Sequence, residues 1–249
     1  RGEIAFFKAF VYLDLVRRWG DCVMIQDEVE LKPIGKTTWP KVTDYAITLA
    51  KEAVRLLPEW NELKESSGAS VSHQARPCKG AANAVLAHLC AWKAGCKYMA
   101  QPQDRDYDEQ QLWRMVDSAC SAIINRQDIY DLESTPDEVC TKTFVDGGKE
   151  CIFESVFRGY WNEFDAMTES NITNLGRYYE AYPAIPGKKI GDNKKTMYRI
   201  LNSTVREMFQ DYTDGSTPIT DLRRDAWFYE FEKMEQEDEE ITGGYAYPY

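Results

Sequence analysis

The sequence predicts a mainly α-helical protein made of helical hairpins, with a loop-rich and partly extended C-terminal portion. Four segments in the first half place apolar residues at helical spacing, and glycines or prolines mark most of their ends. Beyond residue 150 this period gives way to short apolar runs and aromatic rings between polar residues. We therefore expect one domain over 1–249, with a helical core in 1–150 and a loop-rich ligand-binding part in 151–249.

The first expected helix covers residues 3–21, "EIAFFKAFVYLDLVRRWGD". Its charges make it a poor membrane span, and Asp14 is placed to pair with Arg17 or Arg18 before Gly20 ends the helix. Apolar residues cover most of its circumference, so it should be a core helix with neighbours on several sides. One stripe holds Ile4, Phe7, Val11 and Leu15, and the remaining surface holds Phe6, Phe10, Leu13 and Val16.

Three further helices are expected in the first half of the chain. Pro40 suits the first turn of one that Pro58 ends. The segments 78–95, "CKGAANAVLAHLCAWKAG", and 108–125, "DEQQLWRMVDSACSAIIN", follow after a polar loop. Small residues in the first of these allow another backbone to approach closely. The pair therefore resembles a tetratricopeptide (TPR) hairpin, although the repeat signature is not met.

The second half of the sequence is less regular. Residues 151–157, "CIFESVF", are typical of a strand or extended segment rather than a helix. A further helix is expected over 196–212, "TMYRILNSTVREMFQDY". The acidic run 230–241, "EFEKMEQEDEEI", should be a solvated face or a linker.

Composition limits the classes of function. The formal net charge of -11 argues against a nucleic-acid partner, because such proteins carry basic patches. No apolar stretch reaches membrane-span length. The seven cysteines lack CxxC pairs, so we expect no zinc and mainly buried thiols, with a Cys140–Cys151 disulfide as the alternative. Because the chain begins at Arg1 and ends abruptly, it is expected to be a fragment.

Six motifs, taken in order, resemble the SusD/RagB family of nutrient-binding lipoproteins. They are "GEIAFFKAFVYLDLVRRWGD", "TDYAITLAKEAVRLLP", "ARPCKGAANAVLAHLCAWKAG", "ACSAIINRQDIYDL", "KECIFESVF" and "DLRRDAWF". Together they extend over most of the chain, and each alone is weak. The family's lipid-anchoring cysteine and its C-terminal arginine and proline motif are not found in this sequence.

The resemblance implies a fold, a function and a location. The fold would be a SusD-like domain of TPR-like hairpins, here a fragment of it. The function would be to bind an oligosaccharide, or a peptide, and deliver it to a SusC-like TonB-dependent transporter in the outer membrane. The protein would be surface-exposed, held by a lipid anchor outside this chain, and would be neither an enzyme nor a cofactor protein.

A glycan site needs flat apolar faces for the C–H surface of a sugar and polar groups for its hydroxyls. Loop residues between 157 and 182 offer both, although in a chain with 15 tyrosines such rings are more often part of the core. Trp39 is a weaker platform, since a hydrophobic staple explains it equally well. Asp221 and Arg223 suit an ion pair supporting a loop better than a ligand contact. The candidate ligand-binding residues are Tyr160, Trp161, Asn162, Tyr178, Tyr179 and Tyr182.

No catalytic motif is present. His73 and His88 lack motif partners, and there is no nucleophile elbow, phosphate loop or HExxH cluster. A carboxylate pair, as in glycoside hydrolases, would not be visible in the sequence. We therefore name no catalytic and no metal-binding residue. The alternatives to a nutrient-binding protein are an α-helical glycoside hydrolase and a TPR-like protein-binding scaffold.

Overall fold

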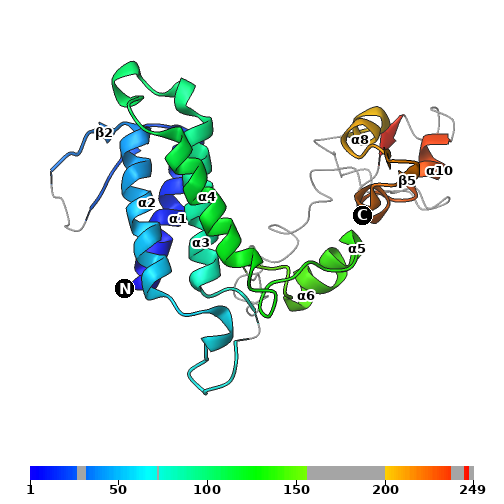
Figure 1. Ribbon diagram of the computed structural model, residues 1–249, viewed down its shortest axis with the longest axis horizontal. Coiled ribbons are helices and arrows are strands. Elements are labelled where there is room, and N and C mark those ends of the chain that lie inside the picture. The colour runs from blue at the N-terminus through cyan, green and yellow to red at the C-terminus, as the bar shows by residue number, and fades with distance from the viewer. Residues whose placement is uncertain (27–31, 72, 156–199, 237–243, 247–249) are drawn as a thin grey trace, which may run out of the picture. The chain divides into compact units, whose positions relative to one another are not determined.

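A computed structural model describes residues 1–26, 32–71, 73–155, 200–236 and 244–246 (Figure 1). The described chain is mainly helical, which confirms the predicted fold class. It divides into two compact units. The first consists of 1–132 and 146–155, and the second of 133–145 together with the described residues beyond 156.

Four long helices form the first unit: α1 (Gly2–Trp19), α2 (Trp39–Leu56), α3 (Lys79–Gly95) and α4 (Glu109–Ile124). Figure 1 shows that they lie side by side and alternate in direction. Consecutive helices pack against each other, α1 on α2, α2 on α3 and α3 on α4, and α1 also contacts α3. The expected hairpins are therefore present, and the four predicted helices end within a few residues of the predicted limits.

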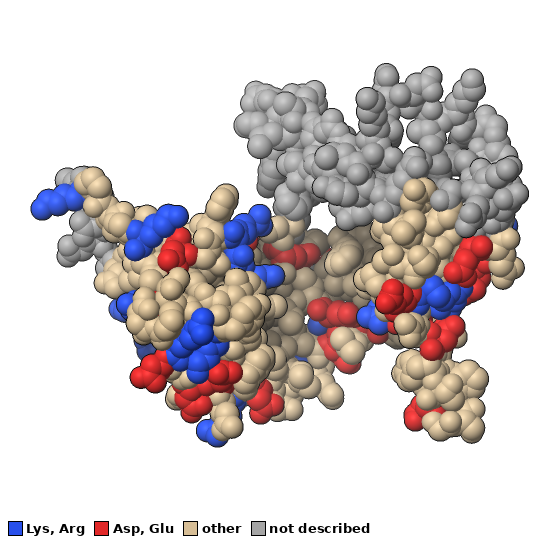
Figure 2. All heavy atoms as spheres, turned by 90° about the horizontal axis from the view of Figure 1, so that it is seen from above, with Lys and Arg blue, Asp and Glu red and all other residues tan. Residues whose placement is uncertain are grey.

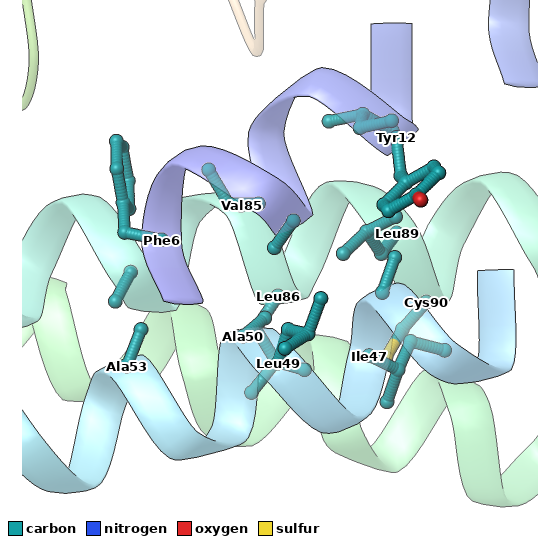
Figure 3. Close-up of a cluster of buried hydrophobic side chains, with 14 of the residues drawn as sticks. Phe6, Tyr12, Ile47, Leu49, Ala50, Ala53, Val85, Leu86, Leu89 and Cys90 are labelled. Atoms are coloured by element: carbon teal, nitrogen blue, oxygen red, sulfur yellow. The ribbon is translucent and has the colours of Figure 1, made fainter. Parts of the chain in front are cut away.

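The core of the first unit forms where α1, α2 and α3 meet (Figure 3). Phe6 of α1 and Leu89 of α3 are almost completely buried. Alanines on the facing sides of α2 and α3 let the helix backbones approach closely, because a methyl group takes little room. The buried side chains that Figure 3 labels are Phe6, Tyr12, Ile47, Leu49, Ala50, Ala53, Val85, Leu86, Leu89 and Cys90.

Among the described residues, α1 is covered mainly on one side. Phe6 and Leu13 are buried, but 45% of Phe7 and 51% of Val11 remain exposed. The expectation that α1 has neighbours on several sides is therefore half met, because α2 and α3 reach one face of the helix. Phe153 partly covers the other face, with its ring centroid 5.0 Å from Phe6 and 5.9 Å from Phe10.

Short elements connect the helices. Gly20 ends α1 with φ +68°, and β1 (Cys22–Val23) then pairs antiparallel with β2 (Lys36–Thr37). The 3-10 turns are Trp60–Glu62, Lys97–Met99 and Pro102–Asp104. Trp39 is buried at the start of α2, and its backbone N–H donates to Asp21 at 2.9 Å. It is therefore a core residue, and the weaker expectation of an exposed platform is wrong.

The second unit contains short elements. A continuous helical run begins with α5 (Pro136–Glu138), passes through a π-helical turn (Val139–Thr143) and ends in α6 (Phe144–Asp146). β3 (Ile200–Leu201) pairs antiparallel with β6 (Tyr245–Ala246). β4 (Tyr212–Asp214) and β5 (Thr217–Ile219) form a hairpin around Gly215, which has φ +62°. The helices are α8 (Asn202–Met208), α9 (Leu222–Trp227) and α10 (Phe231–Gln236).

Two expectations for the second unit are corrected. Of the helix predicted over 196–212, the described residues 200–212 are helical only in α8, because Phe209 leaves helical geometry and its ring turns into the core formed by Val205, Phe228 and Phe231. The acidic run is not wholly a solvated face or linker. Its first residues form α10, with Phe231 buried and Glu232 paired to an arginine.

A buried arginine organises the second unit. Arg224 donates to the Phe209 carbonyl at 3.1 Å and forms ion pairs with Asp211 at 3.2 Å and Glu232 at 2.9 Å. Such a buried cation is stable only because carboxylates and carbonyls surround it. Asp221 caps α9 by accepting from the Arg223 N–H, and their side chains form an ion pair. The predicted ion pair is therefore confirmed, and it stands at the start of a helix.

All seven cysteines are free thiols. Cys22, Cys78 and Cys90 are buried, as expected, and the other four are partly exposed. The alternative Cys140–Cys151 disulfide is not formed. Burial raises the pKa of Cys90 to about 11, which makes that thiol a poor nucleophile at neutral pH.

The surface carries both signs of charge. Figure 2 shows acidic and basic side chains interspersed over the described residues on the face in view. No helix in the described ranges is long and apolar enough to cross a membrane.

Candidate ligand-binding site

The residues predicted to bind a glycan lie outside the residues that the structure describes. They are Tyr160, Trp161, Asn162, Tyr178, Tyr179 and Tyr182. They stay a prediction.

The described part of the first unit contains an apolar hollow of about 450 Å³ at the C-terminal end of α4. We call it the α4 hollow. Ligand pockets of this size are mostly apolar, with a few polar groups that orient the ligand. Here the apolar lining comes from the last turn of α4, the segment after it and the segment 149–152, through Ile123, Ile124, Tyr130, Leu132 and Ile152.

Tyr130 fixes the wall of the α4 hollow that follows the helix. The backbone N–H groups of Ile129 and Tyr130 both donate to the Arg126 carbonyl at 2.8 Å, so the chain turns back directly after α4. The Tyr130 hydroxyl then lies 3.2 Å from the buried Cys78 sulfur at the start of α3. Burial, and secondly this contact with Cys78, raise the pKa of Tyr130 well above its ordinary value. The ring is thus a fixed, neutral wall.

The opposite wall is the segment 148–154, which returns to the helices. The Gln74 side chain donates to the Gly148 carbonyl at 2.8 Å, and the Glu154 N–H donates to the Gln74 carbonyl at 3.1 Å. Glu154 also accepts from the Gln74 N–H and lies 3.0 Å from His73 Nδ1. These contacts hold Ile152 over the hollow. The segment is irregular over Cys151–Ser155, so the alternative of a strand is wrong there, whereas the expected absence of helix is confirmed.

Polar side chains stand at the rim of the α4 hollow. Gln127, Asp131 and Lys149 are exposed, and Glu150 is partly exposed. The Asp131 N–H donates to the Lys149 carbonyl at 3.2 Å, which brings the two rim segments together. No ion pair between the Asp131 and Lys149 side chains is formed. The rim therefore presents two carboxylates, of Asp131 and Glu150, and one ammonium group, of Lys149, near an apolar interior.

A second, smaller hollow of about 260 Å³ lies between α1 and α3. It contains His88 and Trp92, and the Arg17 guanidinium covers the Trp92 ring with its carbon 5.8 Å from the ring centroid. Since the cation already occupies this ring face, the tryptophan is not a free platform for a sugar.

Neither histidine belongs to a catalytic or metal-binding group in the described ranges. His73 contacts Glu154, and His88 is exposed on α3. No cluster of His, Cys, Asp and Glu among the described residues could hold a metal ion.

Sequence reasoning missed the α4 hollow. Its apolar residues come from "ACSAIINRQDIYDL" and "KECIFESVF", which the sequence analysis treated as family landmarks rather than as a site. The signal available was the apolar run after the predicted helix end, Ile129 to Leu132, where a loop should be polar.

Neither a family model nor a curated protein matches the chain. Three solved structures are similar to it: a SusD-like protein from Bacteroides fragilis (19% identity, TM-score 0.45), a SusD-like carbohydrate-binding protein from the same species (17%, 0.42) and a SusD homologue from Bacteroides thetaiotaomicron (18%, 0.44). The similarity covers 63%, 55% and 57% of this chain.

All three solved proteins are SusD-like, the family that the sequence resembles. The matched stretches span only 27%, 23% and 25% of those longer chains. Because identity is below 25% and the TM-scores are below 0.5, this similarity does not identify a ligand or a partner for the present chain.

Proposed function

We propose that the chain is part of a SusD-like, surface-exposed protein that binds a nutrient, most directly an oligosaccharide, and passes it to a SusC-like TonB-dependent transporter. A lipid anchor outside this chain would hold the protein at the outer membrane. One observation carries the proposal: the first four family-like motifs coincide in order with α1, α2, α3 and α4 with the turn that follows it. A chance match of weak motifs would have no reason to follow a single hairpin array.

The described helices suit the role of a scaffold rather than that of the ligand site. The rings of Trp39 and Tyr130 are buried, and the Trp92 ring is covered by a cation. Trp19 on α1 and Trp113 on α4 are exposed. The proposal therefore keeps glycan binding with the six aromatic and amide residues between 160 and 182. Binding sites are often carried by loops on a rigid helical frame.

The test is a glycan array followed by calorimetric titration of the best glycan. Changing Trp161 to Ala should weaken binding at least about fivefold, because a stacked ring contributes on the order of 1 kcal/mol or more. The circular dichroism spectrum and melting temperature should stay near those of the parent. Trp113→Ala is the matched control, since Trp113 is half exposed on α4.

Three results would contradict the proposal. Equal affinity of the Trp161 variant would remove that residue from the site. Hydrolysis products after incubation with glycans would favour the glycoside hydrolase, and saturable binding to a protein without glycan binding would favour the scaffold. The transporter partnership needs its own test, which is co-purification of a TonB-dependent transporter from outer membranes with the anchored full-length protein.

A further inference from the structure

We propose that the α4 hollow is a second binding site, one that takes a free apolar amino acid in its zwitterionic form. This inference does not rest on the proposed function, because it concerns other residues and another ligand. The ligand's side chain would enter the apolar interior, and its charged groups would stay at the rim.

The interior fits an aliphatic or aromatic side chain. Ile123 and Tyr130 are buried at the base, and Ile152 closes the side formed by the returning segment. The volume of about 450 Å³ is at the lower end of the range for small-molecule sites. Transfer of an apolar side chain from water into such a space is favourable by about 25 cal/mol per Å² of buried area. A ligand without apolar surface would gain no transfer free energy in this space.

The mouth of the hollow is open to solvent. Ile124 is 65% exposed and Leu132 is 80% exposed, although both are large apolar residues. Exposed apolar side chains that border a hollow mark a binding site more often than scattered ones do. A ligand would cover both residues without displacing the packed helices.

The rim carries both signs of charge, as a zwitterion requires, with the Lys149 ammonium group and the carboxylates of Asp131 and Glu150. Asp131 can accept from an ammonium group, and Lys149 can donate to a carboxylate. The backbone hydrogen bond from the Asp131 N–H to the Lys149 carbonyl holds the two segments that carry these side chains next to each other. Lys149 interacts electrostatically with Asp128, whose carboxylate is paired with Arg126. The Gln127 side chain is exposed at the rim and can donate or accept.

A sugar fits this site poorly. Sugar C–H faces stack on flat rings, whereas this interior is mainly branched aliphatic. The one ring in the lining, that of Tyr130, has its hydroxyl directed to Cys78. The polar groups also lie at the rim only, so the hydroxyls of a sugar placed inside would remain unpaired.

The experiment is calorimetric titration of the chain with L-phenylalanine and L-leucine, with L-alanine and N-acetyl-L-phenylalaninamide as comparisons. L-Phenylalanine and L-leucine should bind with a Kd of about 1 mM or tighter. Alanine should bind at least about tenfold more weakly because it lacks the apolar body, and the capped amide should also lose about tenfold because it lacks both charges. Equal binding of all four, or no binding of L-phenylalanine, would overturn the proposal.

Variants locate the site. Leu132→Asn and Lys149→Gln should each weaken L-phenylalanine binding by about threefold or more, and both positions are exposed enough for the fold to tolerate the change. Leu222→Asn is the matched control, since Leu222 is similarly exposed on α9 in the other unit. Binding that survives the first two variants would place the amino acid elsewhere. Glycan binding measured on the same samples separates failure of this site from failure of the proposed function.

Discussion

Gly80 and Tyr130 fit together so closely that no side chain can stand between them. A β-carbon on Gly80 would lie 2.1 Å from the Tyr130 hydroxyl oxygen and 2.5 Å from the ring carbon that bears it. Gly80 is in the first turn of α3, and Tyr130 follows α4. This contact seats the ring that forms one wall of the α4 hollow.

Replacing Gly80 with alanine should therefore destabilise the first unit. The added methyl group forces the Tyr130 ring away from Cys78, and overpacking of this kind costs about 1–3 kcal/mol. Urea unfolding followed by circular dichroism measures the loss. Gly95→Ala is the control in the same helix, because nothing lies within 4 Å of its added carbon and alanine favours helix there. Equal stability of the two variants would contradict the packing argument.

The long helices could be predicted because each has a strong local signal. In α2, Pro40 and Pro58 bracket a clear apolar stripe, and in α4, Asp108 caps the first turn through the N–H groups of Gln110 and Gln111. Local signals of this kind do not depend on the rest of the fold. By contrast, the burial of the exposed side of α1 depends on which other segments pack against it, and local signals do not determine that.

The site could be predicted only in part. The α4 hollow depends on Tyr130 reaching the start of α3 and on Glu154 reaching Gln74, contacts that join residues far apart in the sequence. Arg224 was likewise missed as the centre of the second unit, because its neighbour Arg223 belongs to the same motif and the sequence gives no reason to bury one rather than the other. Only tertiary packing distinguishes them.

Lys93 allows a test of a buried charge. Its ammonium is buried on α3, pairs with Asp44 at 2.5 Å and lies 4.3 Å from the Tyr107 ring centroid. Asp44→Asn should cost about 1–2 kcal/mol, less than for a fully buried pair because Asp44 is exposed to solvent. Lys93→Met should be close to neutral, since it removes the buried charge together with its need for a partner. Thermal unfolding of both variants checks this, and a larger loss for Lys93→Met would contradict it.

Tyr107 predicts a loss of stability at high pH. Burial, and secondly the Glu109 carboxylate, raise the pKa of Tyr107 to about 12, whereas the unfolded value is about 10. The folded protein therefore holds the Tyr107 hydroxyl proton more tightly than the unfolded chain does. The contribution of Tyr107 to the free energy of unfolding is complete below pH 10 and falls as pH rises from about 10 to 12. Across this pH range, the urea midpoint of Tyr107→Phe should fall less steeply than that of the parent protein. Equal slopes for the two proteins would contradict the assignment of the high-pH loss to Tyr107.

The second unit should instead lose stability at low pH, because of the Glu232 carboxylate. Its carboxylate accepts two hydrogen bonds from Arg206, at 3.0 and 2.9 Å, and pairs with the buried Arg224. The Arg206 hydrogen bonds lower the pKa of Glu232 below its ordinary value. The stabilisation is therefore present above the unfolded pKa of about 4.3 and is lost as pH falls through the lower folded value.

Changing Glu232 to Gln should lower the stability of this unit at neutral pH, since Arg224 loses a counter-charge in the core. It should also flatten the decline in stability below pH 4.3, because the titrating group is gone. Methyl NMR of the fully buried Val205 during urea unfolding follows this unit alone. Glu207→Gln on the exposed side of α8 is the control and should keep the parent slope. If Glu232→Gln kept that slope as well, the acid response would have to come from another carboxylate.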